Sequence, residues 1–401
     1  MSTTPSTVSL TPEELKMFYK HIVDNNRYIQ KKGKVPVTIE VVGESGIGKT
    51  SSIIQLAEEL GLHFVKLNLA QIEEIGDLVG FPIRQFEMAH PDQKEKAWVN
   101  ENMIDEHLGL GFVSTGKSQM GYCAPEWIAN KSEGGILLLD DWNRADVRFI
   151  QAVMELIDRQ TYVSWKLPKD WHIVLTSNPD NGEYNVNSTD PAQKTRFISA
   201  QLKFESKCWA RWAENNDIDG RCINFLLFHP ELVTRKTNPR SIVMFFNSIS
   251  SIPNFENHLP LIQQIAEGSV GEEFANLFTS FINNRLDKLV SPEELMEHAN
   301  FPEVQKKLFE CIGEGKKYRG DIAGTISTRL INYTIFKAKS EVGKDGKEVI
   351  SRDYLTRLGS IIKTKAFASD ISYAIVKQIF HHSPKFKTLT LDPELSKYIT
   401  N

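Results

Sequence analysis

Four residues between positions 37 and 50 have the types and spacing needed to bind a polyphosphate. Gly43, Gly48, Lys49 and Thr50 fill the fixed positions of G-x-x-x-x-G-K-[ST] in the segment GESGIGKT. Small residues let backbone N–H groups curl round an anion, and a helix opening at Thr50 directs its positive end to the same point. Lys49 can reach the β- and γ-phosphates, and the Thr50 hydroxyl can ligate magnesium. The predicted nucleotide site comprises Gly43, Glu44, Ser45, Gly46, Ile47, Gly48, Lys49, Thr50 and Ser51.

The elements around this loop are those that a phosphate-binding loop requires. Residues 37–42 form an apolar strand-like run, and residues 51–60 have the apolar spacing of a helix. Residues 63–70 form a second strand-like run, so the three segments make a βαβ unit and predict a largely parallel sheet. The alternative is a glycine-rich turn that happens to precede a helix. The flanking strand and helix favour the nucleotide site.

Two acids and one amide follow apolar runs farther along the chain. Residues 136–139 (ILLL) are typical of a strand covered on both faces, and Asp140 and Asp141 follow directly. At the carboxyl end of a parallel sheet, Asp140 would hold magnesium through water and Asp141 would polarise the attacking water. The alternative is an Asp-Asp turn that caps a strand. Asn178 also ends an apolar run and could orient the water, although a turn-forming Asn-Pro has the same appearance.

Two arginines, Arg196 and Arg240, could contact phosphate, although a single arginine is most often a solvated surface charge. The order of the motifs sets them apart. The loop, LLLDDWNRAD, LTSNPD, DPAQKTRF and TNPRS together resemble the AAA+ ATPases, in particular the MoxR-like branch of the helix-2-insert group. Residues 75–80 resemble the D-L-x-G element of that branch, and DDWNRA resembles its D-E-x-N-R-A. The resemblance covers about residues 33–285.

This resemblance implies an ATPase that uses ATP and Mg²⁺. Lys49 and Thr50 match the Walker A positions that contact phosphate and magnesium. Asp140 and Asp141 match Walker B, with Asp140 on the metal, and Asn178 matches sensor 1. The catalytic residues are then expected to be Lys49, Asp141, Asn178 and Arg196.

The resemblance also implies assembly into a homo-oligomeric ring, which is hexameric in this family. Arg196 resembles the arginine finger, which acts on ATP bound to the neighbouring subunit. Arg240 resembles sensor 2 of a helical lid and would contact the nucleotide, and Arg144 could also bridge subunits. Residues 161–172 resemble the presensor-1 hairpin, and the segment 81–125 contains the expected helix-2 insert.

One residue departs from the family pattern. Asp141 stands where the family usually has Glu. Its side chain is one methylene shorter, so the carboxylate lies back by about 1.5 Å, one C–C bond. Because a displacement of about 1 Å can cost on the order of a hundredfold in rate, slow hydrolysis is expected.

Three functions follow from these motifs. The first is a MoxR-like chaperone, an ATPase ring that remodels or activates a protein partner, and analogy with the family points to a partner with a von Willebrand A domain. The second is a nucleic-acid-acting AAA+ motor. The net charge of −4, the pI near 6.2 and the lack of a basic stripe argue against it, and only GEGKKYRG and RLGSIIKTK are modestly basic. The third is a slow-hydrolysing, nucleotide-dependent scaffold, which Asp141 would favour.

The composition predicts a cytoplasmic protein without membrane association. No apolar run approaches the length of a membrane span, and the N-terminus lacks the pattern of a secretory signal. Four cysteines without a C-x-x-C pair argue against a disulfide framework or a zinc site and favour a reducing compartment.

We expect an α/β P-loop core with a parallel sheet, followed by an all-α lid and an α-helical C-terminal extension. The predicted boundaries are 1–32 for a tail and helix, 33–205 for the core, 206–288 for the lid and 289–401 for the helical C-terminal region. Residues 1–10 are expected to be disordered, 81–125 irregular, and 126–130 the end of a helix. Residues 161–165 and 172–175 could pair as a hairpin.

Overall fold

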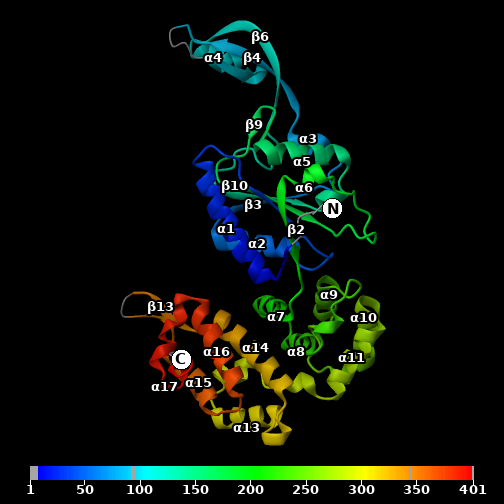
Figure 1. Cartoon of the computed structure of the whole chain (residues 1–401), viewed down its shortest axis with the longest axis vertical. Coiled ribbons are helices and arrows are strands. Elements are labelled where there is room, and N and C mark those ends of the chain that lie inside the picture. The colour runs from blue at the N-terminus through cyan, green and yellow to red at the C-terminus, as the bar shows by residue number, and fades with distance from the viewer. Residues whose placement is uncertain (1–7, 92–95, 344–345, 400–401) are drawn as a thin grey trace, which may run out of the picture. The chain divides into compact units, whose positions relative to one another are not determined.

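The computed structural model describes residues 8–91, 96–343 and 346–399. The chain divides into two compact units, Met1–Lys203 and Phe204–Asn401 (Figure 1). Among the described residues, none of the helices has both the length and the apolar character that a bilayer span needs.

The first unit is built on a six-stranded sheet in which every neighbouring pair is parallel. The strand order is β1-β11-β2-β10-β7-β3, so that β10 lies between β2 and β7. The strands are β1 (Val8–Leu10), β2 (Thr38–Val42), β3 (His63–Asn68), β7 (Gly135–Asp140), β10 (Trp171–Ser177) and β11 (Phe197–Leu202). The predicted parallel α/β core is confirmed.

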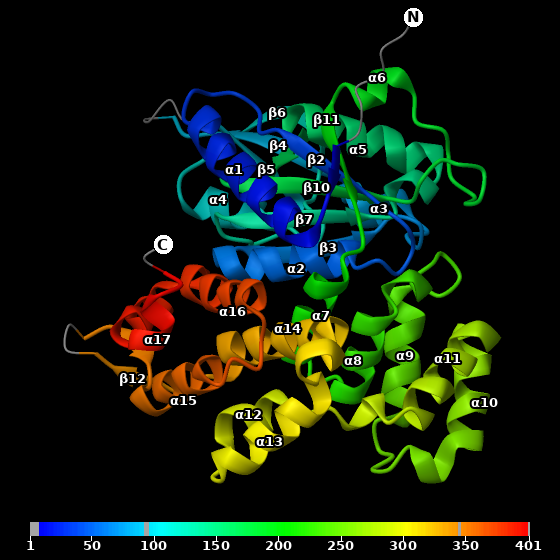
Figure 2. The same cartoon turned by 60° about the horizontal axis from the view of Figure 1, so that its bottom comes forward.

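Helices cover both faces of this sheet because its central strands are apolar on both sides. In β7, Ile136 and Leu138 pack with α1 and α2, whereas Leu137 and Leu139 pack with α3 and α5. The period-2 alternation of side chains explains this division. Figures 1 and 2 show α1 and α2 on one side of the sheet and α5 on the other. The helices of this unit are α1 (Pro12–Gln30), α2 (Lys49–Leu60), α3 (Ile75–Val79), α4 (Ile104–Gly109), α5 (Val147–Arg159) and α6 (Pro191–Lys194).

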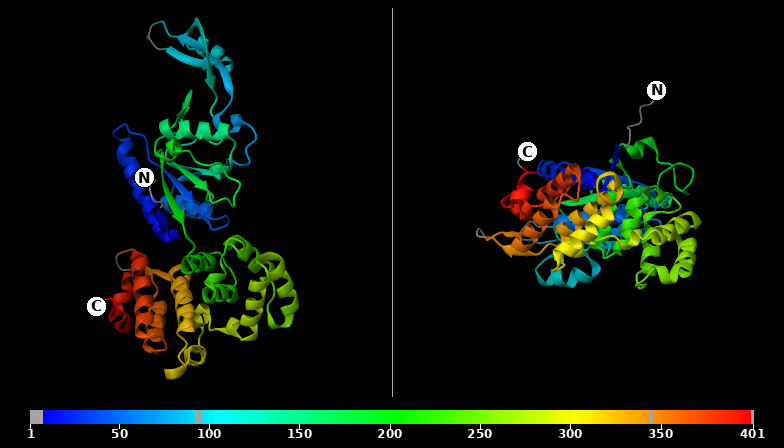
Figure 3. Two further views of the ribbon diagram at one scale, coloured as in Figure 1. Left: turned by 45° about the vertical axis from the view of Figure 1, so that its right-hand side comes forward. Right: turned by 90° about the horizontal axis from the view of Figure 1, so that it is seen from below.

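The segment 81–125 has regular structure, so the expectation of an irregular segment is wrong. It contains α4 and a three-stranded antiparallel sheet in the order β5-β4-β6, which Figure 3 shows apart from the six-stranded sheet. Both ends of the segment meet at Gly80, where a Cβ would lie 1.9 Å from the Cys123 carbonyl oxygen. Glycine is therefore required where the insert leaves the core. The strands are β4 (Pro82–Ala89), β5 (Lys96–Asn100) and β6 (Val113–Tyr122).

Three further expectations about the first unit are wrong. Residues 8–10 form edge strand β1 beside β11, whereas residues 1–7 lie outside the described part of the chain. Residues 126–130 form turns, not the end of a helix. The hairpin pairs β8 (Thr161–Tyr162) with β9 (Trp165–Lys166), whereas β10 lies in the centre of the main sheet. The fully buried β10 needs cover on both faces, which a surface hairpin cannot provide.

In the part of the second unit that the structure describes, the regular elements are helices and one hairpin, β12 (Ser340–Val342) with β13 (Glu348–Ile350). It has two apolar clusters, one of residues 209–282 and one of residues 290–395. Helix α14 packs against helices of both groups, including α7 and α16, as Figure 2 shows. The helices are α7 (Ser206–Asn215), α8 (Gly220–Phe228), α9 (Pro239–Ile249), α10 (Leu259–Val270), α11 (Glu272–Asn283), α12 (Pro292–Glu297), α13 (Phe301–Ile312), α14 (Gly320–Lys337), α15 (Arg352–Lys363), α16 (Ser369–His382) and α17 (Pro393–Ser396).

Candidate functional site

The glycine-rich loop connects the carboxyl end of β2 to α2, as predicted. Gly46 and Gly48 have φ angles of 75° and 101°, a left-handed conformation that favours glycine. Helix α2 starts at Lys49 without a side-chain hydrogen bond at its N-cap. Its first N–H groups and its dipole can therefore serve an anionic ligand. This is a P-loop on a parallel α/β sheet.

Lys49 lies at the centre of the loop and is only 7% exposed. Its Nζ donates hydrogen bonds to the carbonyl oxygens of Gly43 (2.7 Å) and Glu44 (3.1 Å) and to Oδ1 of Asn178 (3.1 Å). The ammonium group is thus held beside the residue predicted to be sensor 1. Strands β2 and β10 are neighbours, and the Gly43 N–H donates to the Ser177 carbonyl, so the two segments meet through the sheet itself.

Asp140 is the buried acid of the site, at 8% exposure. The Thr50 hydroxyl donates to its two carboxylate oxygens at 3.1 and 3.3 Å, and the Thr176 hydroxyl donates to Oδ1. Lys66 Nζ lies 2.8 Å from Oδ2. Burial opposes ionisation, but the hydrogen bonds from Lys66, Thr176 and Thr50 and the charge of Lys66 outweigh it, and they lower the pKa of Asp140 below its ordinary value.

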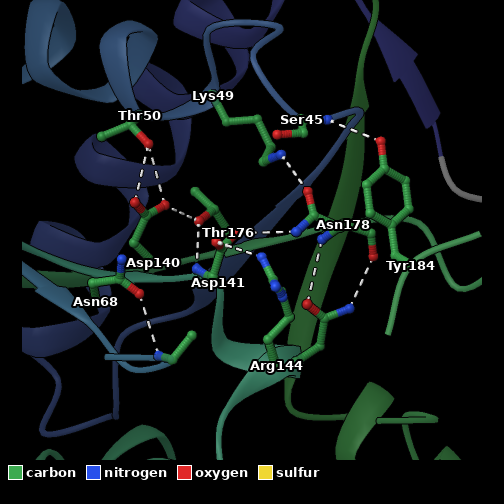
Figure 4. Close-up of polar contacts among 12 residues, drawn as sticks. Ser45, Lys49, Thr50, Asn68, Asp140, Asp141, Arg144, Thr176, Asn178 and Tyr184 are labelled. Atoms are coloured by element: carbon green, nitrogen blue, oxygen red, sulfur yellow. Dashed lines mark hydrogen bonds and ion pairs between the residues drawn. The ribbon is translucent and has the colours of Figure 1, made fainter. Parts of the chain in front are cut away.

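Asp141 follows in a left-handed conformation with φ 52° and ψ 37°, which Asp tolerates better than most residues. Its N–H donates to the Thr176 hydroxyl at 3.1 Å. Asn178 Nδ2 donates to Asp141 Oδ1 at 3.1 Å, and Arg144 Nη1 lies 3.7 Å from Oδ2 (Figure 4). The two groups expected to handle the attacking water are therefore in direct contact.

Asn178 is held in place by Asn143, whose role the motifs alone do not predict. The Asn143 side chain accepts from the Asn178 N–H at 3.3 Å and donates to the Asn178 carbonyl at 2.8 Å. Tyr184 follows in the next loop, where its hydroxyl accepts from the Ser45 N–H at 3.3 Å and donates to Glu44 at 2.7 Å. Burial, followed by the Glu44 hydrogen bond, raises the pKa of Tyr184.

Four residues of the network were thus missed: Lys66, Asn143, Thr176 and Tyr184. Asn143 and Thr176 lie inside the motifs DDWNRAD and LTSNPD, so motif position could have identified them. Lys66 lies two residues before the end of a strand that neighbours β7, a signal that requires the strand order. Tyr184 lies in a loop without secondary structure and had no signal in the sequence.

Arg196 lies at the amino-terminal edge of the parallel strands, opposite the carboxyl-terminal edge that carries the glycine-rich loop. It precedes Phe197, which pairs with Thr38 at the amino end of β2, whereas the loop follows the carboxyl end. The five residues of β2 separate the level of Phe197 from the start of the loop by roughly 17 Å. Arg196 Nε donates to Asp158 at 2.7 Å and Nη1 donates to the Ala192 carbonyl at 2.9 Å. The structure thus does not bring Arg196 to the loop of its own chain.

Arg240 belongs to the second unit, where it is exposed in the first turn of α9. Its predicted contact with nucleotide stays a prediction. Ser51 is exposed in the first turn of α2.

The oxygen groups at the site suit magnesium. Thr50 and Asp140 offer a hydroxyl and a carboxylate next to a loop shaped for phosphates. Mg²⁺ is commonly held by one or two such protein groups together with water and substrate phosphates. Within residues 8–91, 96–343 and 346–399, no group of three His, Cys, Asp or Glu side chains is arranged to hold a metal alone.

Comparison with known proteins gave structural matches only. No protein-family profile matches the chain, and no curated protein matches it. Matching solved structures include three of RuvB from Thermotoga maritima, two of them of point mutants. One mutant structure has 12% identity over 87% of this chain and 97% of that one, with a TM-score of 0.35. The other has 13% identity over 86% and 94%, with a TM-score of 0.35. The structure described as a Holliday junction branch migration motor has 12% identity over 86% and 94%, with a TM-score of 0.34.

Proposed function

We propose that this protein is an AAA+ ATPase of the MoxR-like branch that binds ATP with Mg²⁺ and hydrolyses it to ADP and phosphate. The observation that carries the proposal is the meeting of Lys49, Thr50, Asp140, Asp141 and Asn178 at one edge of the sheet. These residues come from three separate segments, and a turn or a cap would not require them to meet.

The contacts suit phosphoryl transfer to water. The loop N–H groups and Lys49 bind the β- and γ-phosphates and stabilise the charge that develops on them. Thr50 and, through water, Asp140 would hold magnesium, which would supply positive charge to the same phosphate oxygens. Asp141 accepts a proton from the attacking water, which Asn178 orients, as the water oxygen bonds to the γ-phosphorus. The bond from that phosphorus to the bridging oxygen breaks, and ADP leaves. Asn143 positions Asn178 through two hydrogen bonds.

We further propose that the subunits form a ring, with six members by family resemblance, in which Arg196 completes the site of a neighbour. Arg196 lies at the edge of the sheet opposite its own loop. Among the residues that the structure describes, its guanidinium forms an ion pair with Asp158 only. An arginine supplied by another subunit can stabilise the transition state without binding the nucleotide of its own chain. The ring would remodel or activate a protein partner, and the family resemblance favours a von Willebrand A domain.

A mixing experiment tests both parts of this proposal. Arg196→Ala should lower ATP turnover by about 10³ while ATP affinity stays nearly unchanged. The Lys49→Ala variant should lose nucleotide binding, but it still carries an intact Arg196. Mixing the two variants should restore turnover, because a Lys49→Ala subunit can supply Arg196 to a neighbour whose loop is intact. Normal turnover of Arg196→Ala as a dilute monomer, or no recovery on mixing, would contradict action between subunits.

A slow-hydrolysing nucleotide-dependent scaffold is the second candidate. The short Asp141 side chain favours this function. So does its contact with Asn178, whose Nδ2 donates to Asp141 Oδ1 at 3.1 Å and so engages one of the two carboxylate oxygens. Single-turnover measurements of ATP cleavage decide between the two functions. Turnover no faster than that of Lys49→Ala would support the scaffold, and turnover that Asp140→Asn abolishes would support the ATPase.

A further inference from the structure

We propose that Lys66 is a built-in counter-ion of Asp140 that competes with the divalent cation, so that magnesium binds well only together with nucleotide phosphates. The inference rests on the proposed magnesium site and adds a positioning residue to it. No sequence motif includes Lys66. Its role follows from where the sheet places its ammonium group.

The strand register brings Lys66 to Asp140. Lys66 in β3 pairs with Leu138 in β7, and Asn68 pairs with Asp140. Residues two apart on a strand lie on the same face, so Lys66 and Asp140 share a face, at a separation of about 7 Å along the strands. A side chain must be long to span that distance. Lys66 does so, and its Nζ lies 2.8 Å from Asp140 Oδ2.

Asp140 already has a partner on each oxygen. Oδ1 accepts from Thr176 and Thr50, and Oδ2 faces Lys66 and also accepts from Thr50 at 3.3 Å. The Asp140 side chain is 11% exposed, whereas that of Lys66 is 39% exposed. The acid is thus held in place by several partners, whereas the lysine side chain reaches it from a partly exposed position. A buried carboxylate without a counter-charge is costly, so the lysine stabilises the acid.

A divalent cation approaching Thr50 and Asp140 meets this positive charge at close range. Like charges a few ångströms apart repel each other, more strongly at low dielectric than near the surface. The phosphates of a nucleotide bring enough negative charge to accommodate both cations. The consequence is that Mg²⁺ alone is held weakly, and Mg²⁺ with ATP is held well.

The test is the affinity of the full-length protein for Mg²⁺ alone, measured by titration calorimetry without nucleotide. Lys66→Met should tighten Mg²⁺ binding by about tenfold, and Lys66→Arg, which keeps the charge, should leave it near the wild-type value. Lys16→Met is the matched control, because Lys16 also pairs with an acid, Glu59 at 2.6 Å, away from the site. It should not change Mg²⁺ affinity.

Each outcome separates this inference from the proposed function. Unchanged or weaker Mg²⁺ binding by Lys66→Met, in protein that still binds Mg²⁺ with ATP, would overturn the role of Lys66 and leave the ATPase standing. Loss of ATP affinity with no change for Mg²⁺ would make Lys66 a phosphate ligand and also overturn it. Wild-type protein that binds neither ATP nor Mg²⁺ would overturn both proposals. Lys66→Gln, checked by thermal unfolding, replaces the Met variant if that variant does not fold.

Discussion

The two edges of the parallel sheet use polar residues in different ways. At the carboxyl edge, Lys49, Asp140 and Asn178 are each at most 8% exposed and are held by hydrogen bonds within the site. At the amino edge, Arg196 is exposed, and it contacts the Asp158 carboxylate and the Ala192 carbonyl. Buried polar groups that hold one another in place are pre-organised for chemistry within their own chain, whereas an exposed cation is available to another molecule.

The amino edge also contains a partly buried polar network, whose contacts join a helix to a strand and do not form a catalytic group. His172 Nε2 lies 3.0 Å from Asp170, and Nδ1 lies 3.3 Å from the Asn26 amide. Arg27 Nε donates to the two carboxylate oxygens of Asp170, at 2.9 and 3.0 Å. Both Asn26 and Arg27 belong to α1. The network therefore ties α1 to the start of β10, and none of these contacts involves the loop.

The largest predicted effect is at the carboxyl edge. Asp140→Asn keeps the shape of the side chain but removes the charge that would hold magnesium and face Lys66. ATP turnover should fall by roughly 10³. Phosphate release under saturating ATP measures it, and Asp24→Asn is the matched control, because Asp24 faces Arg27 of the amino-edge network and, among the residues that the structure describes, contacts none of the proposed site. Loss of less than tenfold would mean that Asp140 does not organise the metal.

Asp141→Glu should raise turnover, by up to about a hundredfold. The added methylene would carry the carboxylate past Asn178 toward the attacking water. Rapid-quench measurement of ATP cleavage checks the change, with Asp141→Asn as the variant that should be slower than wild type. If the Glu variant is slower than wild type, then the hydrogen bond between Asp141 and Asn178 sets the rate, and the length of the acidic side chain does not.

At the amino edge, His172 should make stability depend on pH. Burial lowers the pKa of His172, while the charge and the hydrogen bond of Asp170 oppose that effect and Arg27 adds to it. Because the folded-state pKa lies below the ordinary value near 6.5, the unfolded chain binds the proton first. The contribution of His172 to stability is therefore fully present above about pH 6.5 and is lost as the pH drops below it. Urea unfolding at several pH values measures the free energy of unfolding. Below about pH 6.5 this free energy should fall less steeply with pH in His172→Gln than in the wild type, and an identical dependence on pH would contradict this role.

The smallest predicted effect is that of Asp158→Ala. The pair with Arg196 is exposed, so the free energy of unfolding should fall by no more than about 1 kcal/mol. Turnover should change far less than in Arg196→Ala, because the arginine itself remains. A turnover loss as large as that of Arg196→Ala would mean that Asp158 holds the arginine in its working position, and the contrast between the two edges would need revision.

The insert and the central strand show why parts of the fold could not be predicted. Strand β6 is exposed along most of its length, so its pairing with β4 leaves little hydrophobic pattern in the sequence. The proximity of residues 161–165 and 172–175 in the sequence predicts a local hairpin, but the second segment is buried on both faces. Only a place between β2 and β7 provides that burial, and pairing with strands far away in the sequence decides it.

The sequence by itself determined the chemical groups and the local elements that carry them. The glycine-rich loop, the strand ending at Asp140 and the helix after the loop depend on residues close together in the chain, and short-range sterics and periodicity are enough to specify them. Tertiary structure decided which groups meet. Placing β10 between β2 and β7 brings Asn178 to Lys49 and Asp141, and placing β3 beside β7 brings Lys66 to Asp140. These meetings depend on strand order, which follows from burying both faces of the sheet and not from any local pattern.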